Sequence, residues 1–164
     1  MKNVFSKRSL RFLESARVGH LSTADSRGKP HVVPVVFVVD AKSIYTPIDG
    51  KRKGDPWKLQ RIRNILENPQ VGFLVDRYEE DWSKLGFVFI RGSATVLRAQ
   101  HNEGEETEGE EYRRSILLLR SKYPQYRSVP LGGPEGLLIR ITPESCSTWG
   151  RLEEENSSET SATG

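Results

Sequence analysis

The spacing of apolar residues along the chain predicts a mainly β protein. Short runs rich in β-branched and aromatic residues cover residues 18–24, 31–39, 43–48, 71–76, 87–97 and 136–142. Most connections between neighbouring runs are too short for the crossovers that parallel strands need. We therefore expect about six antiparallel strands, and closing them into a small barrel or half-barrel would remove exposed strand edges.

Two of these runs carry further expectations. The run at 31–39, HVVPVVFVV, is apolar at nearly every position, as is usual for a strand that is buried on both faces. It predicts one strand with one side in the barrel and the other against a partner subunit. Gly92 interrupts the run at 87–97 and predicts a bulge or the close approach of another backbone.

Three segments beside these runs show helical signals. Residues 6–16 start with Ser6, a favourable N-cap, and carry apolar residues at helical spacing. Residues 56–67 begin with a proline directly after Asp55, which suits a cap followed by the first helical position. Residues 112–123, YRRSILLLRSKY, form the third expected helix.

A single domain accounts for residues 1–150, since the chain of 164 residues is long enough for one substantial core. Residues 100–111 contain six glutamates in twelve positions and few apolar residues, which predicts a solvated acidic loop inserted in the domain. Residues 151–164, RLEEENSSETSATG, are polar throughout most of their length. We expect them to form a disordered tail.

The composition narrows the class of protein. Apolar residues make up 35% of the chain and charged residues 29%, a balance typical of globular proteins. The single cysteine, Cys146, excludes an intrachain disulfide, and no Cys/His spacing indicates a metal site. A signal peptide and a membrane-spanning run of about 20 apolar residues are both missing from the sequence. These features predict a cytoplasmic protein with no membrane partner.

Positive charge is concentrated in one stretch, residues 46–63, TPIDGKRKGDPWKLQRIR. A strand, a glycine-containing loop and a capped helix follow one another there, an order that can present backbone N–H groups and a helix N-terminus to a phosphate. The Walker pattern GxxxxGK[ST] and the dinucleotide pattern GxGxxG are both missing from the sequence. By itself the stretch is also compatible with a solvated loop.

Nucleic acid is a poor candidate for the anionic partner. Residues 1–99 carry 18 Lys and Arg against 10 Asp and Glu, yet acids are interleaved with the bases, and the glutamates at 100–111 would repel a phosphate backbone. Catalytic side chains are scarce as well, because His20, His31 and His101 have no nucleophile motif around them. Any chemistry is therefore expected to belong to a bound cofactor.

The order of several segments resembles a known family. ARVGHLSTADSRGKPHVVPVVFVVD, SIYTPID, the basic stretch, NILENPQVGFLVD and FIRGSATVL are similar to the pyridoxamine 5′-phosphate oxidase-like split β-barrel family. YEEDWSKL, KYPQY and Trp149 resemble its branch of deazaflavin (coenzyme F420)-dependent oxidoreductases. The similarity covers about residues 8–149 and rests on order and spacing.

The resemblance implies a homodimer with cofactor sites along the subunit interface, each built from both chains. Val33, Pro34, Val35 and Thr46 match the positions that line the cofactor ring in the family. Lys51, Lys53, Lys58 and Arg61 match the basic positions that hold the phosphate group, and which of the four touches phosphate is left open. Arg77 and Trp82 are candidates to cover the site from the other subunit.

The resemblance also implies the function. We expect an F420-dependent oxidoreductase that transfers hydride between the reduced cofactor and a small electron-poor acceptor. One alternative is an oxidoreductase of the same fold that binds flavin mononucleotide (FMN). A second is a non-catalytic cofactor-binding or tetrapyrrole-binding protein, because one fold hosts several functions.

Overall fold

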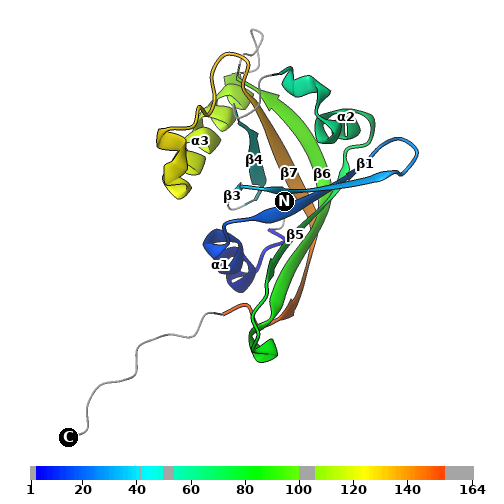
Figure 1. The fold of residues 1–164 in the computed structure, drawn as a ribbon, viewed down its shortest axis with the longest axis vertical. Helices are drawn as coiled ribbons and strands as arrows, with labels where there is room; N and C mark the ends of the chain where they lie inside the picture. Colours follow the sequence, from blue (N-terminus) through cyan, green and yellow to red (C-terminus); the bar gives the residue numbers. More distant parts are fainter. Residues whose placement is uncertain (1–2, 41, 50–53, 100–105, 154–164) are drawn as a thin grey trace, which may run out of the picture.

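The computed structural model describes residues 3–40, 42–49, 54–99 and 106–153 (Figure 1). Its strands are β1 Gly19–Ala24, β2 Pro30–Val35, β3 Val38–Val39, β4 Ile44–Ile48, β5 Gln70–Arg77, β6 Gly86–Arg98 and β7 Leu137–Gly150. Its α-helices are α1 Lys7–Ser15, α2 Gln60–Glu67 and α3 Glu106–Lys122, and its 3₁₀ turns are η1 Pro56–Lys58, η2 Trp82–Lys84 and η3 Pro124–Arg127.

The strands form one antiparallel sheet in the order β2-β1-β5-β6-β7-β4-β3. The two edge strands, β2 and β3, are separated in the chain by Val36 and Phe37 alone. The sheet therefore has to curl until its opposite edges meet at this link, as the sweep of the long strands in Figure 1 shows. A mainly β half-barrel of antiparallel strands, as expected for a split barrel, is confirmed.

One strand prediction is wrong, because residues 31–39 do not form a single strand. They divide into β2 and β3, which occupy opposite edges of the sheet. Nor is the run buried on both faces within one chain, since Val32 in β2 is 59% exposed. The apolar pattern shows which residues avoid water, but it does not show that the chain changes edges at Phe37.

The prediction at Gly92 is confirmed. β6 and β7 pair along almost their whole length, and their register shifts between Arg91 and Gly92. A Cβ atom at Gly92 would lie 2.2 Å from the carbonyl oxygen of Thr142, which is too close for any side chain. The bulge and the close backbone approach therefore occur together, and strong local twist is expected at such a site.

Helices α1 and α2 pack with the inner face of the sheet. Phe12 and Leu13 of α1 and Ile62 and Ile65 of α2 are buried in the same core cluster as the inward residues of the strands. The Ser6 cap is confirmed, since its side chain accepts a hydrogen bond from the backbone N–H of Ser9.

The helix expected from Pro56 begins later. Asp55 does cap this segment, because its carboxylate accepts from the backbone N–H of Trp57. However, Pro56–Lys58 form only the 3₁₀ turn η1, Leu59 is extended, and α2 starts at Gln60. The cap motif predicted the helical start correctly. The extended Leu59 then interrupts the segment after Lys58, so it does not form a single continuous helix.

Helix α3 packs on the outer face of the sheet, where it builds a second core cluster with β3, β4, β6 and β7. It starts at Glu106, so the expected acidic loop is wrong for residues 106–111, while residues 100–105 lie outside the described residues. Acidic side chains near a helix N-terminus interact favourably with the helix dipole, and Arg120 and Lys122 occupy the last turn. The charge pattern thus fits a helix as well as a loop.

The expected tail also begins too early. β7 extends beyond the expected end at residue 142, through Trp149 to Gly150. Beyond it, Leu152 is 7% exposed and belongs to the inner core, and the backbone N–H of Arg151 donates to the carbonyl of Leu85 at 2.8 Å. Residues 154–164 lie outside the part of the chain that the structure describes.

Candidate cofactor site

The candidate ring-lining residues lie on the two strands that border the opening of the half-barrel. Within the described residues, β2 pairs only with β1, and β4 pairs with β3 only as far as Tyr45. We call these two unpaired edges, β2 and residues 46–48 of β4, the barrel seam. Pro34 and Pro47 both lie there, where a residue without an N–H costs no ladder hydrogen bond.

The chain brings the two sides of the seam together at one end. Val38 is paired with Tyr45, and the three Cα–Cα steps from Val35 to Val38 span at most about 10 Å. With one strand spacing of about 5 Å, Val35 lies within about 15 Å of Tyr45, the residue before Thr46. The candidate residues of both strands can therefore contact one small molecule.

The side chains at the seam face different ways. Val33 and Val35 are half-buried and pack against the inner core, whereas Pro34 points to the outer face and is exposed. Thr46 is 2% exposed and alternates inward with Ile44, which lies in the inner core. A ring lying at the seam would meet the backbone edge of β4 at Thr46 rather than an exposed hydroxyl.

The candidate phosphate residues are only partly described. Lys51 and Lys53 lie outside the described residues. Lys58 is exposed in η1, and Arg61 is half-buried in the first turn of α2. These two cations therefore lie on η1 and α2, two consecutive elements in the second half of the basic stretch.

Arg98 is a cation that the sequence analysis did not single out. It ends β6, and its guanidinium lies 4.5 Å from the ring centroid of Trp57, a distance typical of a cation–π contact. Since Lys58 follows Trp57, this contact places the end of β6 beside η1. The two residues are 41 positions apart, so only the fold reveals that they meet.

Buried polar contacts fix α2 on the sheet. Asn64 is 1% exposed and donates from Nδ2 to Oγ1 of Thr23 in β1 at 3.0 Å, while Gln60 donates to Oδ1 of Asn64 at 2.7 Å. Such pairing avoids the cost of a buried polar group without a partner. It also fixes the rotation of the helix that carries Arg61.

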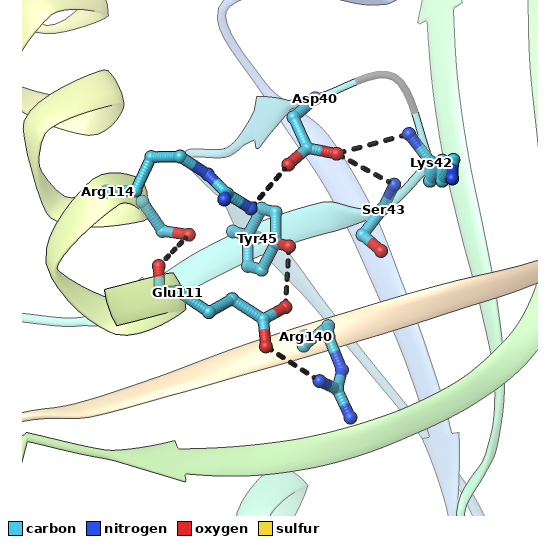
Figure 2. Close-up of polar contacts among 8 residues, drawn as sticks. Asp40, Lys42, Ser43, Tyr45, Glu111, Arg114 and Arg140 are labelled. Atoms are coloured by element: carbon cyan, nitrogen blue, oxygen red, sulfur yellow. Dashed lines mark hydrogen bonds and ion pairs between the residues drawn. The ribbon is translucent and has the colours of Figure 1, made fainter. Parts of the chain in front are cut away.

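Strand β4 is fixed from outside by α3 (Figure 2). The phenol of Tyr45 donates to Glu111 Oε1 at 2.7 Å, and Arg140 Nη1 donates to Glu111 Oε2 at 2.8 Å. Burial, followed by the hydrogen bond to Glu111, raises the pKa of Tyr45 to about 12. At neutral pH the Tyr45 hydroxyl therefore stays protonated and donates to Glu111, which also accepts from Arg140.

A second contact holds the turn before β4. Arg114 of α3 donates to Asp40 Oδ2 at 3.1 Å, and Asp40 Oδ1 accepts from the backbone N–H groups of Lys42 and Ser43 (Figure 2). Sequence analysis missed this network because its members come from three separate segments. Glutamates at 100–111 were visible, but their partners on β4 and β7 were not.

Arg77 and Trp82 lie elsewhere in the chain. Arg77 is the last residue of β5 and Trp82 the first of η2, at the β5–β6 hairpin that Figure 1 shows at the far end of the long strands from α2. Arg77 donates from Nε to the carbonyl of Lys84 at 3.1 Å and from Nη2 to the carbonyl of Arg151 at 2.5 Å. Trp82 is 72% exposed. Within one chain they do not join the seam, and their role across an interface stays a prediction.

The outer face of the sheet divides at the β6–β7 bulge. The covered half is the set of outward residues beneath α3, Val38, Tyr45, Leu97 and Leu138. The bare half is the set of outward apolar residues on the other side of the bulge, Val32, Pro34, Leu74, Phe87, Phe89 and Trp149. Phe87 and Trp149 stack at 5.8 Å, and Arg91 lies 4.8 Å from the ring centroid of Phe89.

Two further observations concern the described part of the chain. No cluster of three or more His, Cys, Asp or Glu residues suited to a metal ion occurs there. None of its helices combines the length and apolar character needed to cross a bilayer.

A curled antiparallel sheet of seven strands with an open seam defines a split-barrel fold. The family described as pyridoxamine 5′-phosphate oxidase matches residues 5–150. The chain belongs to this family, as the resemblance in its sequence indicated.

One curated relative has a defined activity. The 5a,11a-dehydrotetracycline/5a,11a-dehydrooxytetracycline reductase of Streptomyces rimosus is 31% identical over 94 residues, which are 57% of this chain and 64% of the relative. The match thus spans slightly less than two thirds of the relative's length.

Solved structures show the same fold. An F420 reductase has a TM-score of 0.55 at 22% identity, covering 84% of this chain and 94% of its own. HutZ, a haem storage protein from Vibrio cholerae, has a TM-score of 0.60 at 16% identity, covering 85% of this chain and 89% of its own. At these identities the likeness concerns the fold alone.

Proposed function

We propose that the protein is a homodimeric oxidoreductase that uses coenzyme F420 to reduce a small electron-poor organic acceptor. The observation that carries this proposal is the Arg98–Trp57 contact, which places the end of β6 beside the segment that carries Lys58 and Arg61. Similarity to a dehydrotetracycline reductase and to an F420 reductase supports the reaction class. A cytoplasmic location remains part of this proposal.

The residues present suit such a cofactor. A phosphate with further anionic groups requires several cations, and Lys58, Arg61 and Arg98 would hold them together with Lys51 and Lys53. The flat ring requires an apolar wall beside an unpaired backbone edge, which Val33, Val35 and the edge at Thr46 offer. The bound deazaflavin would supply the hydride.

The chain's own part would be to bind and orient. Val33 and Val35 would exclude water from one side of the ring, and a partner subunit on the bare half would exclude it from another. Holding donor and acceptor in contact geometry converts the reaction to an effectively unimolecular step. No general acid or base is assigned.

Titration of the purified protein with F420 and with FMN, followed by tryptophan fluorescence, tests the proposal, because Trp57 lies in the basic segment. F420 binding with micromolar or tighter affinity is expected. Absence of F420 binding would reject the proposal.

A variant sharpens the test. Replacing Lys51 and Lys53 together by alanine is expected to weaken F420 binding by about 2–4 kcal/mol if both form charge-assisted hydrogen bonds to phosphate. The free energy of unfolding should stay nearly constant, because exposed charges contribute little to it. Equal losses of binding and stability would indicate a structural cluster instead.

Two alternatives have specific support. The same cations would hold the phosphate of FMN, and a yellow protein on purification would favour an FMN-dependent oxidoreductase. The fold of HutZ supports a cofactor-binding protein without turnover. Bound cofactor with no reduction of quinones, nitro compounds, enones or biliverdin would favour that alternative.

A further inference from the structure

Helix α3 and the η3 turn contact β4 on both sides of Thr46. Before it, Tyr45 donates to Glu111, which is held in turn by Arg140 (Figure 2). After it, the phenol of Tyr126 in η3 donates to Asp49 Oδ2 over 3.4 Å. Asp49 is the residue directly after the end of β4. The two contacts therefore enclose the stretch of β4 whose backbone edge forms one side of the seam.

These contacts matter because the end of β4 is paired on one side only. Beyond Tyr45 its only strand neighbour in the described residues is β7. Tyr45 and Tyr126 are both buried in the α3 cluster, so their rings are fixed by packing and their hydroxyl groups reach β4 in one geometry. An unpaired strand edge opens more readily than a paired one unless side chains hold it.

We propose that Tyr45, Glu111, Arg140, Tyr126 and Asp49 form a brace that positions the end of β4 for cofactor binding. We call this set the β4 brace, and its members are positioning residues that do not touch the cofactor. The inference rests on the proposed function for its effect on affinity. Arg114, which holds the turn before β4 through Asp40, adds a second contact from α3.

The brace predicts an effect on affinity that exceeds its effect on folding. The double variant Tyr45→Phe with Tyr126→Phe removes two hydroxyl groups and keeps both rings. If the end of β4 then samples open states, the apparent dissociation constant for F420 should rise about 5- to 20-fold, because only the closed fraction binds. Glu111→Gln, which keeps an acceptor for Tyr45, should fall between this variant and the wild type.

Tyr112→Phe is the matched control. Tyr112 lies on α3 directly after Glu111 and is 5% exposed, but its hydroxyl has no hydrogen-bond partner in the described structure. Its removal should leave the dissociation constant within about 2-fold of the wild-type value. A purely structural role for the Tyr45 and Tyr126 hydroxyl groups would instead move affinity and melting temperature together in the double variant.

The experiment combines fluorescence titration of the full-length protein with F420 and FMN and hydrogen exchange of the backbone amides of residues 44–49 without cofactor. Faster exchange there and weaker binding in the double variant, with Tyr112→Phe unchanged, are expected. Wild-type exchange and affinity in the double variant would overturn the brace. If the wild type binds neither cofactor, the proposed function fails, and the exchange rates alone decide whether the brace exists.

Discussion

The two halves of the outer sheet face are built from similar residues but differ in what lies on them. In the covered half, Tyr45 and Leu138 are almost completely buried beneath α3. In the bare half, Val32 is 59% and Trp149 55% exposed. None of the helices in the described part of the chain packs there, because α1 and α2 lie on the inner face.

The difference shows how one strand can serve two environments. β6 contributes Phe89 to the bare half and Leu97 to the covered half, and the bulge after Arg91 separates them. Partly or fully exposed apolar side chains gathered on one face, such as the stacked Phe87 and Trp149, commonly mark an interaction surface. We therefore place the proposed subunit interface on the bare half and expect the covered half to stay solvent-facing through α3 in the dimer.

A charge on the bare half should have the largest effect. Val32→Glu would place a carboxylate in the proposed interface, where burying an unpaired charge is strongly unfavourable. We expect the dimer dissociation constant to rise about 1000-fold, or about 4 kcal/mol, in sedimentation velocity experiments. Leu117→Glu is the matched control, because Leu117 is 65% exposed on α3. A dimer that tolerates Val32→Glu, or one disrupted by Leu117→Glu, would place the interface elsewhere.

A cavity in the covered half should have the next largest effect. Leu119 of α3 is completely buried, and truncating a leucine in a core to alanine costs about 2–5 kcal/mol. Leu119→Ala should lower the midpoint of urea unfolding, and the decrease should be the same at every protein concentration. By contrast, Phe89→Ala on the bare half should lose more stability in dilute than in concentrated samples. Concentration-independent behaviour of both variants would remove the distinction.

The pH dependence of stability tests how α3 meets α1. Burial, with Arg17 as the second cause, lowers the pKa of Lys122 from 10.5 to about 8. Its ammonium group lies 4.1 Å from the ring centroid of Phe37 and 3.4 Å from the carbonyl of Leu13. Glu14 acts in the opposite direction to burial.

Between these two pH values the unfolded chain binds more protons at Lys122 than the folded chain does. The contribution of this residue to stability should therefore rise with pH from about 8 to about 10.5. In Lys122→Met the slope of melting temperature against pH should be less positive than in the wild type over that range. Parallel curves for the two proteins would show that Lys122 is well solvated.

The smallest effect is expected at Tyr45. Its pKa is raised to about 12 by burial and by Glu111, so the stability that the neutral phenol provides is complete below about pH 10 and is lost as the pH rises towards 12. Tyr45→Phe should reduce the alkaline loss of stability by a small amount, since burial raises the pKa of other tyrosines as well. Circular dichroism at 222 nm against pH would measure it.

Local patterns predicted much of this fold, and long-range contacts account for most of what they missed. Ser6 and Asp55 act as caps, and Gly92 marks a bulge, because each depends on the backbone within a few residues. The division of residues 31–39 between two sheet edges depends on how the whole sheet curls. No property of those nine residues alone determines it.

The candidate site shows the same division. Lys58 and Arg61 were visible as part of a basic run, whereas Arg98 enters only because β6 ends beside Trp57. Glu111 was assigned to a solvated loop because of its acidic neighbours. Its partners Tyr45 and Arg140 are 66 and 29 residues away, and no charge pattern of the sequence connects them.

After Gly150 the chain stays attached to the β5–β6 hairpin, and this gives a practical rule for protein engineering. Arg77 donates to the carbonyls of Arg151 and Glu153, and Leu152 fills a place in the inner core. A stop codon after Gly150 would therefore remove a core side chain and the two carbonyls that accept from Nη2 of Arg77, at a cost of about 2–4 kcal/mol. A stop codon or an affinity tag placed after Glu153 would keep these contacts of residues 151–153 intact.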